Sequence, residues 1–125
     1  MNEGKTIHLL LTTNPAFAAL VADATGKKRV YPLRAAQGTD FPYCTYTKVN
    51  TEYIQCSDRV NLVEKSLIQI SFFAKDYEQV EKMDYAARMA MRAADTIFIA
   101  SRDLFEDDAI AYHRASDYYL NTINT

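Results

Sequence analysis

The chain has 125 residues, of which 49% are hydrophobic and 24% are charged, and its formal net charge at pH 7 is -2. This length allows one globular domain over residues 1–125 with roughly two thirds of its unfolded surface buried, and it excludes a second domain. The balanced charge excludes an intrinsically disordered chain and a surface that binds nucleic acid through charge alone.

The first predicted helix spans residues 15–24. Asn14 is a suitable N-cap and Pro15 suits the first turn, where its missing N–H costs nothing. Apolar residues then recur at helical spacing until Gly26, which favours a stop. Before this helix, the segment from Lys5 to Leu11 predicts a helical turn of its own.

Three strands are predicted next. Pro32 removes a donor from the short strand Val30–Leu33, which indicates an edge position. Residues 43–55 alternate as a strand should, and Ser57-Asp58-Arg59 predicts a tight turn into a long strand over residues 60–75. Because the polar members of this strand lie near the turn, burial is expected to increase along it, which leaves a hairpin with a polar outer half.

The second predicted helix spans residues 77–94 and begins at a capping box formed by Asp76 and Gln79. Two further strands, Ile97–Ser101 and Ala109–Leu120, are predicted around an acidic corner at residues 103–108. The order of helix, three strands, helix and two strands predicts an α+β fold. We expect a mainly antiparallel sheet of about five strands, with two helices packed on one face.

Residues that could carry chemistry are scattered. No recognised metal-ligand spacing is present among the candidate ligands, which are His8, Cys44, Cys56, His113 and Glu106 to Asp108. The three glycines form no phosphate-binding motif, so no cofactor is predicted. A thiol nucleophile at Cys44 or Cys56, meeting His113 in space, stays open as an alternative. Neither cysteine belongs to a CxxC motif, and the first residues do not resemble a signal peptide, so we expect a reduced, cytosolic protein without a membrane span.

The remaining polar segments are candidate contact surfaces. Nine tyrosines favour protein interfaces, although a nucleic-acid-binding face is an alternative if Tyr43, Tyr46 and Tyr53 share one side of the sheet. Edge strands and the long loop between Pro32 and Pro42 also favour self-association. The candidate contact residues lie in that loop, at the hairpin turn and at the acidic corner: Arg34, Gln37, Asp40, Phe41, Asp58, Arg59, Glu106 and Asp107.

Four phrases in sequence resemble the tail-completion, or tail-to-head joining, proteins of long-tailed bacteriophages and prophages. They are "NPAFAALV" (14–21), "RVYPLRAAQGTDFPYCTY" (29–46), "SLIQISFFAKDYEQVEKM" (66–83) and "RDLFEDDAIAYHRASDYY" (102–119). The resemblance covers nearly the whole chain in order and spacing. Ala36 departs from the pattern, because the family has a proline in that loop.

The resemblance implies a small α+β subunit of a virion tail, assembled in the host bacterial cytoplasm. It implies a non-enzymatic homo-oligomer, hexameric in the family, that forms a ring capping the tail tube. Its implied partners are the tail tube protein and the head-tail connector protein, with DNA only passing through the lumen. A ring requires a heterologous interface between unlike patches. A small α+β enzyme or ligand-binding domain using a thiol, and a nucleic-acid-binding module, are the alternatives.

Overall fold

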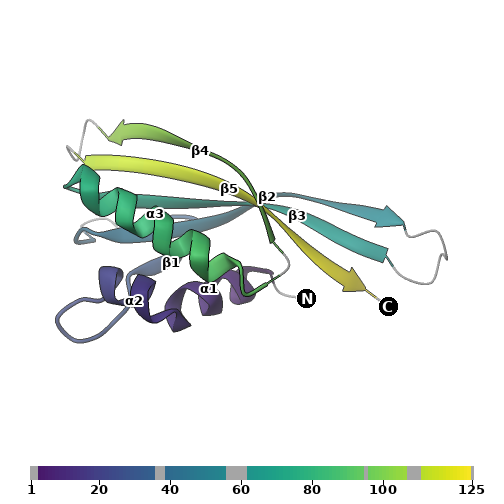
Figure 1. Cartoon of the computed structure of the whole chain (residues 1–125), viewed down its shortest axis with the longest axis horizontal. Helices are drawn as coiled ribbons and strands as arrows, with labels where there is room; N and C mark the ends of the chain where they lie inside the picture. The colour runs from purple at the N-terminus through teal and green to yellow at the C-terminus, as the bar shows by residue number, and fades with distance from the viewer. Residues whose placement is uncertain (1–2, 36–38, 56–61, 95, 107–110, 125) are drawn as a thin grey trace.

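Three helices cover one face of a twisted five-stranded sheet (Figure 1). The computed structural model describes residues 3–35, 39–55, 62–94, 96–106 and 111–124. The sheet order is β1-β2-β3-β5-β4, with β1 parallel to β2 and every other neighbouring pair antiparallel. The predicted α+β class is therefore confirmed. The elements are α1 (Glu3–Thr13), α2 (Pro15–Val21), β1 (Val30–Pro32), β2 (Tyr43–Gln55), β3 (Leu62–Ala74), α3 (Tyr77–Met91), β4 (Thr96–Glu106) and β5 (Ala111–Asn124).

The N-terminal segment forms a full helix, α1, where a single turn was predicted. Ile7 and Leu11 lie one turn apart and are fully buried, so packing on the sheet stabilises a helix that its own sequence would not. Asn14 separates α1 from α2 and caps α2 as predicted, because its Oδ1 accepts the Phe17 N–H at 3.0 Å. The α2 helix ends at Val21, three residues earlier than predicted.

The early end of α2 has a local cause. The Asp23 carboxylate accepts the backbone N–H groups of Thr25 and Lys27, which turns the chain away from the helix. The Thr25 hydroxyl also donates to this carboxylate, and its hydrogen bond is the main cause of a lowered pKa for Asp23, with the two backbone hydrogen bonds adding to it. Gly26 then takes a left-handed φ of 88°, where a side chain would be strained.

The β2–β3 hairpin is confirmed, with a register of Tyr43 opposite Phe73 and a bulge between Lys48 and Asn50. The expected gradient of burial along β3 is wrong, because Glu64 and Ser66 are buried like the apolar residues farther along the strand. Strand β3 is central, since it pairs with β2 on one side and with β5 over its whole length on the other. Ser66 also contacts the Thr51 hydroxyl of β2 at 3.1 Å.

The α3 helix begins as predicted, with the Asp76 side chain accepting the Glu78 N–H at 3.1 Å. It buries the predicted apolar stripe on the sheet, including Val80, Met83 and Ala87, and ends at Met91. Among the described residues, no helix has the length and the apolar composition needed to cross a membrane.

The β4 strand is longer than predicted, and this corrects the acidic corner. Residues 103–106 belong to the strand, paired in register with β5 from Asp103 opposite Arg114 to Glu106 opposite Ala111. Their charges suggested a turn, whereas the ladder to β5 and the ion pair of Asp103 with Arg114 hold them in an extended conformation. Strand β5 likewise continues beyond the predicted Leu120 to Asn124.

Candidate functional site

The candidate contact residues do not gather into one site. Strands β1 and β4 form opposite borders of the sheet, which places the loop after β1 and Glu106 of β4 on different sides of the molecule (Figure 1). Glu106 ends β4, opposite Ala111. The candidates Gln37, Asp58, Arg59 and Asp107 lie outside the described residues.

Within the loop after β1, the described candidates behave differently. Arg34 and Asp40 are exposed, as a contact role requires. Phe41 instead packs against its own sheet, with its ring 5.3 Å from that of Tyr43 and the Lys75 ammonium 4.8 Å from its centroid. The ring therefore anchors the end of the loop.

Leu33 is a feature of this loop that the sequence did not indicate. Its side chain is 72% exposed, and its backbone takes a left-handed φ of 65°. The Arg34 N–H donates to the Pro32 carbonyl at 2.7 Å, and the Leu33 N–H donates to the Tyr46 carbonyl at 2.8 Å, so a tight turn is centred on Leu33. A left-handed conformation costs a leucine on the order of 1 kcal/mol, and glycine or asparagine is the usual residue there.

The opposite border of the sheet exposes an apolar strand. Strand β4 has 11 residues and has no strand partner on its outer side within the described ranges. Its exposed large hydrophobic side chains lie in two groups, one near each end of the strand, and exposed apolar residues on an unpaired edge are a site for joining another chain. These residues are Ile97, Phe98, Ile99, Leu104 and Phe105.

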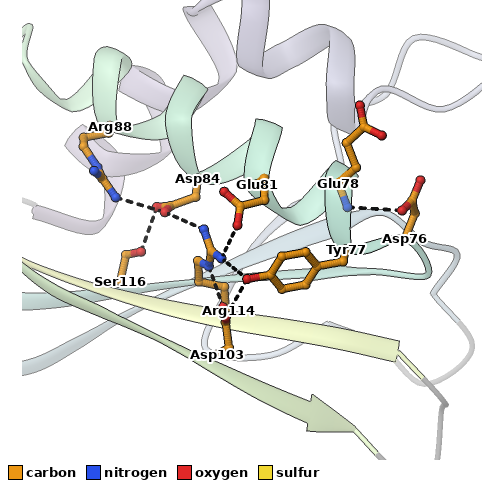
Figure 2. Close-up of polar contacts among 9 residues, drawn as sticks. All are labelled: Asp76, Tyr77, Glu78, Glu81, Asp84, Arg88, Asp103, Arg114 and Ser116. Atoms are coloured by element: carbon orange, nitrogen blue, oxygen red, sulfur yellow. Dashed lines mark hydrogen bonds and ion pairs between the residues drawn. The ribbon is translucent and has the colours of Figure 1, made fainter.

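A polar network centred on Arg114 joins α3 to the last two strands (Figure 2). Its guanidinium donates from Nε to Asp103 Oδ1 at 2.7 Å, from Nη2 to Glu81 Oε1 at 2.7 Å and from Nη1 to Asp84 Oδ2 at 3.2 Å. The same Nη2 donates to the Tyr77 hydroxyl at 2.9 Å, and that hydroxyl donates to Asp103 Oδ2 at 2.7 Å. One arginine thus connects three carboxylates from α3 and β4.

Asp84 is the buried end of this network, with 3% of the residue exposed. Its Oδ1 accepts the Ser116 hydroxyl at 2.9 Å, and its Oδ2 accepts a second arginine, Arg88, at 3.0 Å. Arg88 also lies over the Phe98 ring of β4, 4.0 Å from its centroid. The carboxylate is therefore compensated on both oxygens, as a buried charge must be.

The network changes the pKa values of its members. Hydrogen bonds from Arg114, followed by those from Tyr77, hold the pKa of Glu81 and of Asp103 below their ordinary values of 4.5 and 3.8. The hydrogen bond to Asp103 is the main cause of a raised pKa for Tyr77. The same carboxylates, Glu81 first, raise the pKa of Arg114, which stays charged at every accessible pH.

A small cleft of about 260 Å³ lies beside the network, between α3 and β4. The charged groups lining it include Asp84, Arg88 and Arg114, and each of these already has an ionic partner within the chain. The arrangement acts as a structural clamp between the helix layer and the border strand. The sequence showed no sign of it, because the pairs that Arg114 makes are separated by 11 to 37 positions.

The clamp predicts a loss of stability in acid. Because the pKa values of Glu81 and Asp103 are lowered by folding, their contribution is present above about pH 4.5 and is lost as protonation proceeds at lower pH. We expect the free energy of unfolding, measured by urea titration, to fall between about pH 5 and pH 3. The Arg114→Met variant should show a shallower fall, and an identical pH profile for both proteins would contradict this role.

The thiol alternative finds no support in the described residues. Cys44 is fully buried, and burial raises the pKa of its thiol, so the reactive thiolate is disfavoured. Cys44 of β2 lies opposite Phe72 of β3, and Phe72 lies opposite Arg114 of β5, so these three side chains share the face that the helices cover. His113 is the neighbour of Arg114 in β5 and therefore lies on the open face. The two side chains do not meet. Cys56 lies outside the described residues.

The open face of the sheet carries an aromatic row. The Tyr43 ring stacks on Phe73 at 4.7 Å, and Phe73 stacks on His113 at 4.1 Å. The prediction that Tyr43 and Tyr46 share one face for nucleic-acid binding is wrong. Tyr46 points to the helix layer, where its ring centroid lies 6.0 Å from that of His8 in α1. The row stabilises the sheet through cross-strand contacts.

Comparison with known proteins identifies the fold and no family. No protein-family model matches the chain, and no curated protein matches it. A chain in a solved structure described as "Virion of native gene transfer agent (GTA) particle" superimposes with a TM-score of 0.72 at 14% sequence identity. The match covers 94% of this chain and 92% of that chain, so the two share their fold over almost their whole lengths.

Proposed function

We propose that this chain is a structural subunit of a phage-like virion and that it closes the tail tube as an oligomeric ring joining the tube to the head connector. The observation that carries the proposal is the fold shared with a chain of a gene transfer agent virion over nearly the full length of both. The four phrases that resemble tail-completion proteins give the more specific assignment to the tail.

The surfaces of the chain support a joint better than an enzyme. The cleft between α3 and β4 is lined by ion pairs that hold the fold together, and the described cysteine is buried. In contrast, both borders of the sheet expose side chains that a monomer does not need, at Leu33 and along β4. On this proposal the chain needs no cofactor and works by contact with copies of itself, with tube subunits and with the connector.

The candidate contact residues enter the proposal as parts of three surfaces. Arg34, Gln37 and Asp40 belong to the loop after β1, Asp58 and Arg59 to the turn of the long hairpin, and Glu106 and Asp107 to the end of β4 and the residues after it. The hairpin and the end of β5 extend past the helix layer (Figure 1), which suits a contact with a partner above or below the ring.

Replacing Arg34 and Asp40 together with alanine should weaken assembly about tenfold or more without a measurable change in melting temperature, because both side chains are exposed. The measurement is size exclusion with light scattering and negative-stain imaging, for the protein alone and mixed with the tail tube protein of the same prophage. Rings, or tubes capped at one end, are expected for the wild type.

A matched Cys44→Ser variant separates the proposal from the thiol alternative. It should assemble and cap tubes as the wild type does, with at most a modest loss of stability. A wild-type protein that stays monomeric and leaves tube ends unchanged would overturn the proposed function.

A further inference from the structure

Two strands of the sheet each carry a β-bulge. In β2, Val49 is the extra residue, because its neighbours Lys48 and Asn50 pair with consecutive residues of β3. In β4, Ile99 is the extra residue for the same reason against β5. The ladder between β3 and β5, which lie between these two strands, is regular over its whole length. The sheet therefore has one extra residue in each of the two strands that flank a regular central pair.

The two bulges lie at the same level of the sheet. Lys48 of β2 and Phe98 of β4 belong to one row of cross-strand partners, which Ile68 and Tyr118 complete between them. One bulge directly follows this row in β2, and the other directly follows it in β4. Three inter-strand spacings, about 14 Å, separate the bulged strands, so the side chains of the two bulges do not touch.

The same row marks a change in the sheet. Among the described side chains, Ile68 is the last buried apolar residue of β3 towards the hairpin, and the next helix-facing position is Ser66, whose hydroxyl meets that of Thr51 at 3.1 Å. The first residue of β4 lies opposite Leu120, so only three strands continue beyond it. They extend past the helix layer (Figure 1). We call them the arm, residues 52–55, 62–65 and 121–124, and the helix-covered part of the sheet the body.

The matched positions of the bulges have a geometric consequence. A bulge bends its strand and increases the local right-handed twist. A single bulge lengthens one side of a sheet, so it also curves the sheet in its plane towards the other side. Equal bulges on both sides cancel this curvature, and the two longer paths suit flanking strands that wind around a central pair. A matched pair therefore adds twist at one level.

We propose that the bulges at Val49 and Ile99 act together as one device, which concentrates the twist of the sheet at a single level and so sets the rotation of the arm relative to the body. On the proposed function, the arm suits a contact with a partner above or below the ring, and the device aims that contact. The coupling between the two bulges goes beyond the proposed function, because it is a property of the isolated chain.

Deleting a bulge residue leaves every other strand pair in place. Without Val49, Lys48 and Asn50 follow one another opposite consecutive residues of β3, and deletion of Ile99 makes β4 regular in the same way. Each single deletion leaves the other bulge unmatched, so we expect each to lower the melting temperature by about 5 °C or more. The double deletion restores two equal sides and should melt at or above the temperature of the less stable single variant.

This pattern distinguishes a pair from two separate bulges. Changes at sites about 14 Å apart with no shared partner normally add. A double deletion that melts below both single variants would overturn the coupling. A single variant that does not fold, beside a double variant that does, would support it.

Crystal structures test the geometry without depending on the variants. In the wild type, the rotation between successive rows of β3 and β5 should be largest at Ile68 and Tyr118. Even rotation along these strands, or a missing bulge in either flanking strand, would overturn the proposal. In the folded double deletion, the arm should turn relative to the body by roughly 20°, the usual twist between neighbouring strands.

The matched control keeps both bulges and changes their side chains. Val49→Ser combined with Ile99→Ser removes two apolar side chains that are 54% and 43% exposed. This variant should melt and cap tubes as the wild type does, whereas the folded double deletion should bind tube ends at least about tenfold more weakly in negative-stain titrations. Loss of capping by the serine variant, or normal capping by the double deletion, would overturn the role of the bulges in aiming the arm. Tubes left uncapped by the wild type would remove the proposed function, and the melting temperatures would still decide the coupling.

Discussion

Replacing Arg114 with methionine should lower the free energy of unfolding by about 3 kcal/mol, at the lower end of the range for breaking a buried ion pair. The substitution keeps a long apolar stem but leaves the buried Asp84 with two partners among the described residues, Arg88 and Ser116. It also releases Glu81 and Asp103, which are half exposed and regain water, so they add little to the loss. The measurement is urea unfolding at pH 7, followed by circular dichroism.

Arg102→Met is the matched control for this prediction. Arg102 makes one ion pair with Asp117 at 3.2 Å on the open face, with 52% of its side chain exposed, so its loss should cost less than about 1 kcal/mol. Adding Asp84→Asn to the Arg114 variant should recover part of the lost stability, since the uncompensated charge is then gone. A cost below about 1 kcal/mol for Arg114→Met would show that the network is not a clamp.

The clamp matters for the proposed assembly because it reaches β4. Asp103 lies on this strand, Arg114 on its neighbour β5, and Glu81 and Asp84 on the helix that covers both. The contact of Arg88 with Phe98 attaches a second point of the strand to α3. A border strand with exposed apolar residues is thus held in one conformation before any partner binds, which lowers the ordering cost of an interface.

Local rules explain what the sequence predicted correctly. The start of α2 follows from Asn14 and Pro15, the start of α3 from Asp76, and the hairpin from alternating residues around a turn. Each of these signals lies within a few positions of the element that it specifies. They were sufficient for the α+β class and for most element boundaries.

The errors arise where distant residues decide the outcome. The acidic residues of β4 were predicted to form a turn, because the sequence does not show that Arg114 of β5 pairs with Asp103 across the two strands. Glu64 and Ser66 were predicted near an exposed end of the strand because they are polar, and the extension of β5 that pairs Glu64 with Thr122 was not predicted. The left-handed backbone at Leu33 is contrary to residue preference, so no local pattern could have indicated it.

Replacing Phe17 with alanine should lower the free energy of unfolding by about 3–5 kcal/mol. Phe17 of α2 is fully buried and meets Phe72 of β3 edge to face, with ring centroids 6.1 Å apart. The helix has seven residues, too few to be stable without this packing, so the cavity left by the ring should detach α2 from the sheet. Thermal and urea unfolding measure the loss.

Leu9→Ala provides the comparison for Phe17→Ala, because this leucine of α1 is 48% exposed and its truncation should cost less than about 1 kcal/mol. If Phe17→Ala cost as little as Leu9→Ala, the helix layer would not depend on the contact between α2 and the sheet. The variant also separates folding from assembly. Phe17 is fully buried, so the folded fraction of Phe17→Ala should assemble with wild-type affinity, whereas the variant with Arg34 and Asp40 replaced by alanine should retain its stability and lose that affinity. Opposite effects of this kind would assign stability to the core and assembly to the loop after β1.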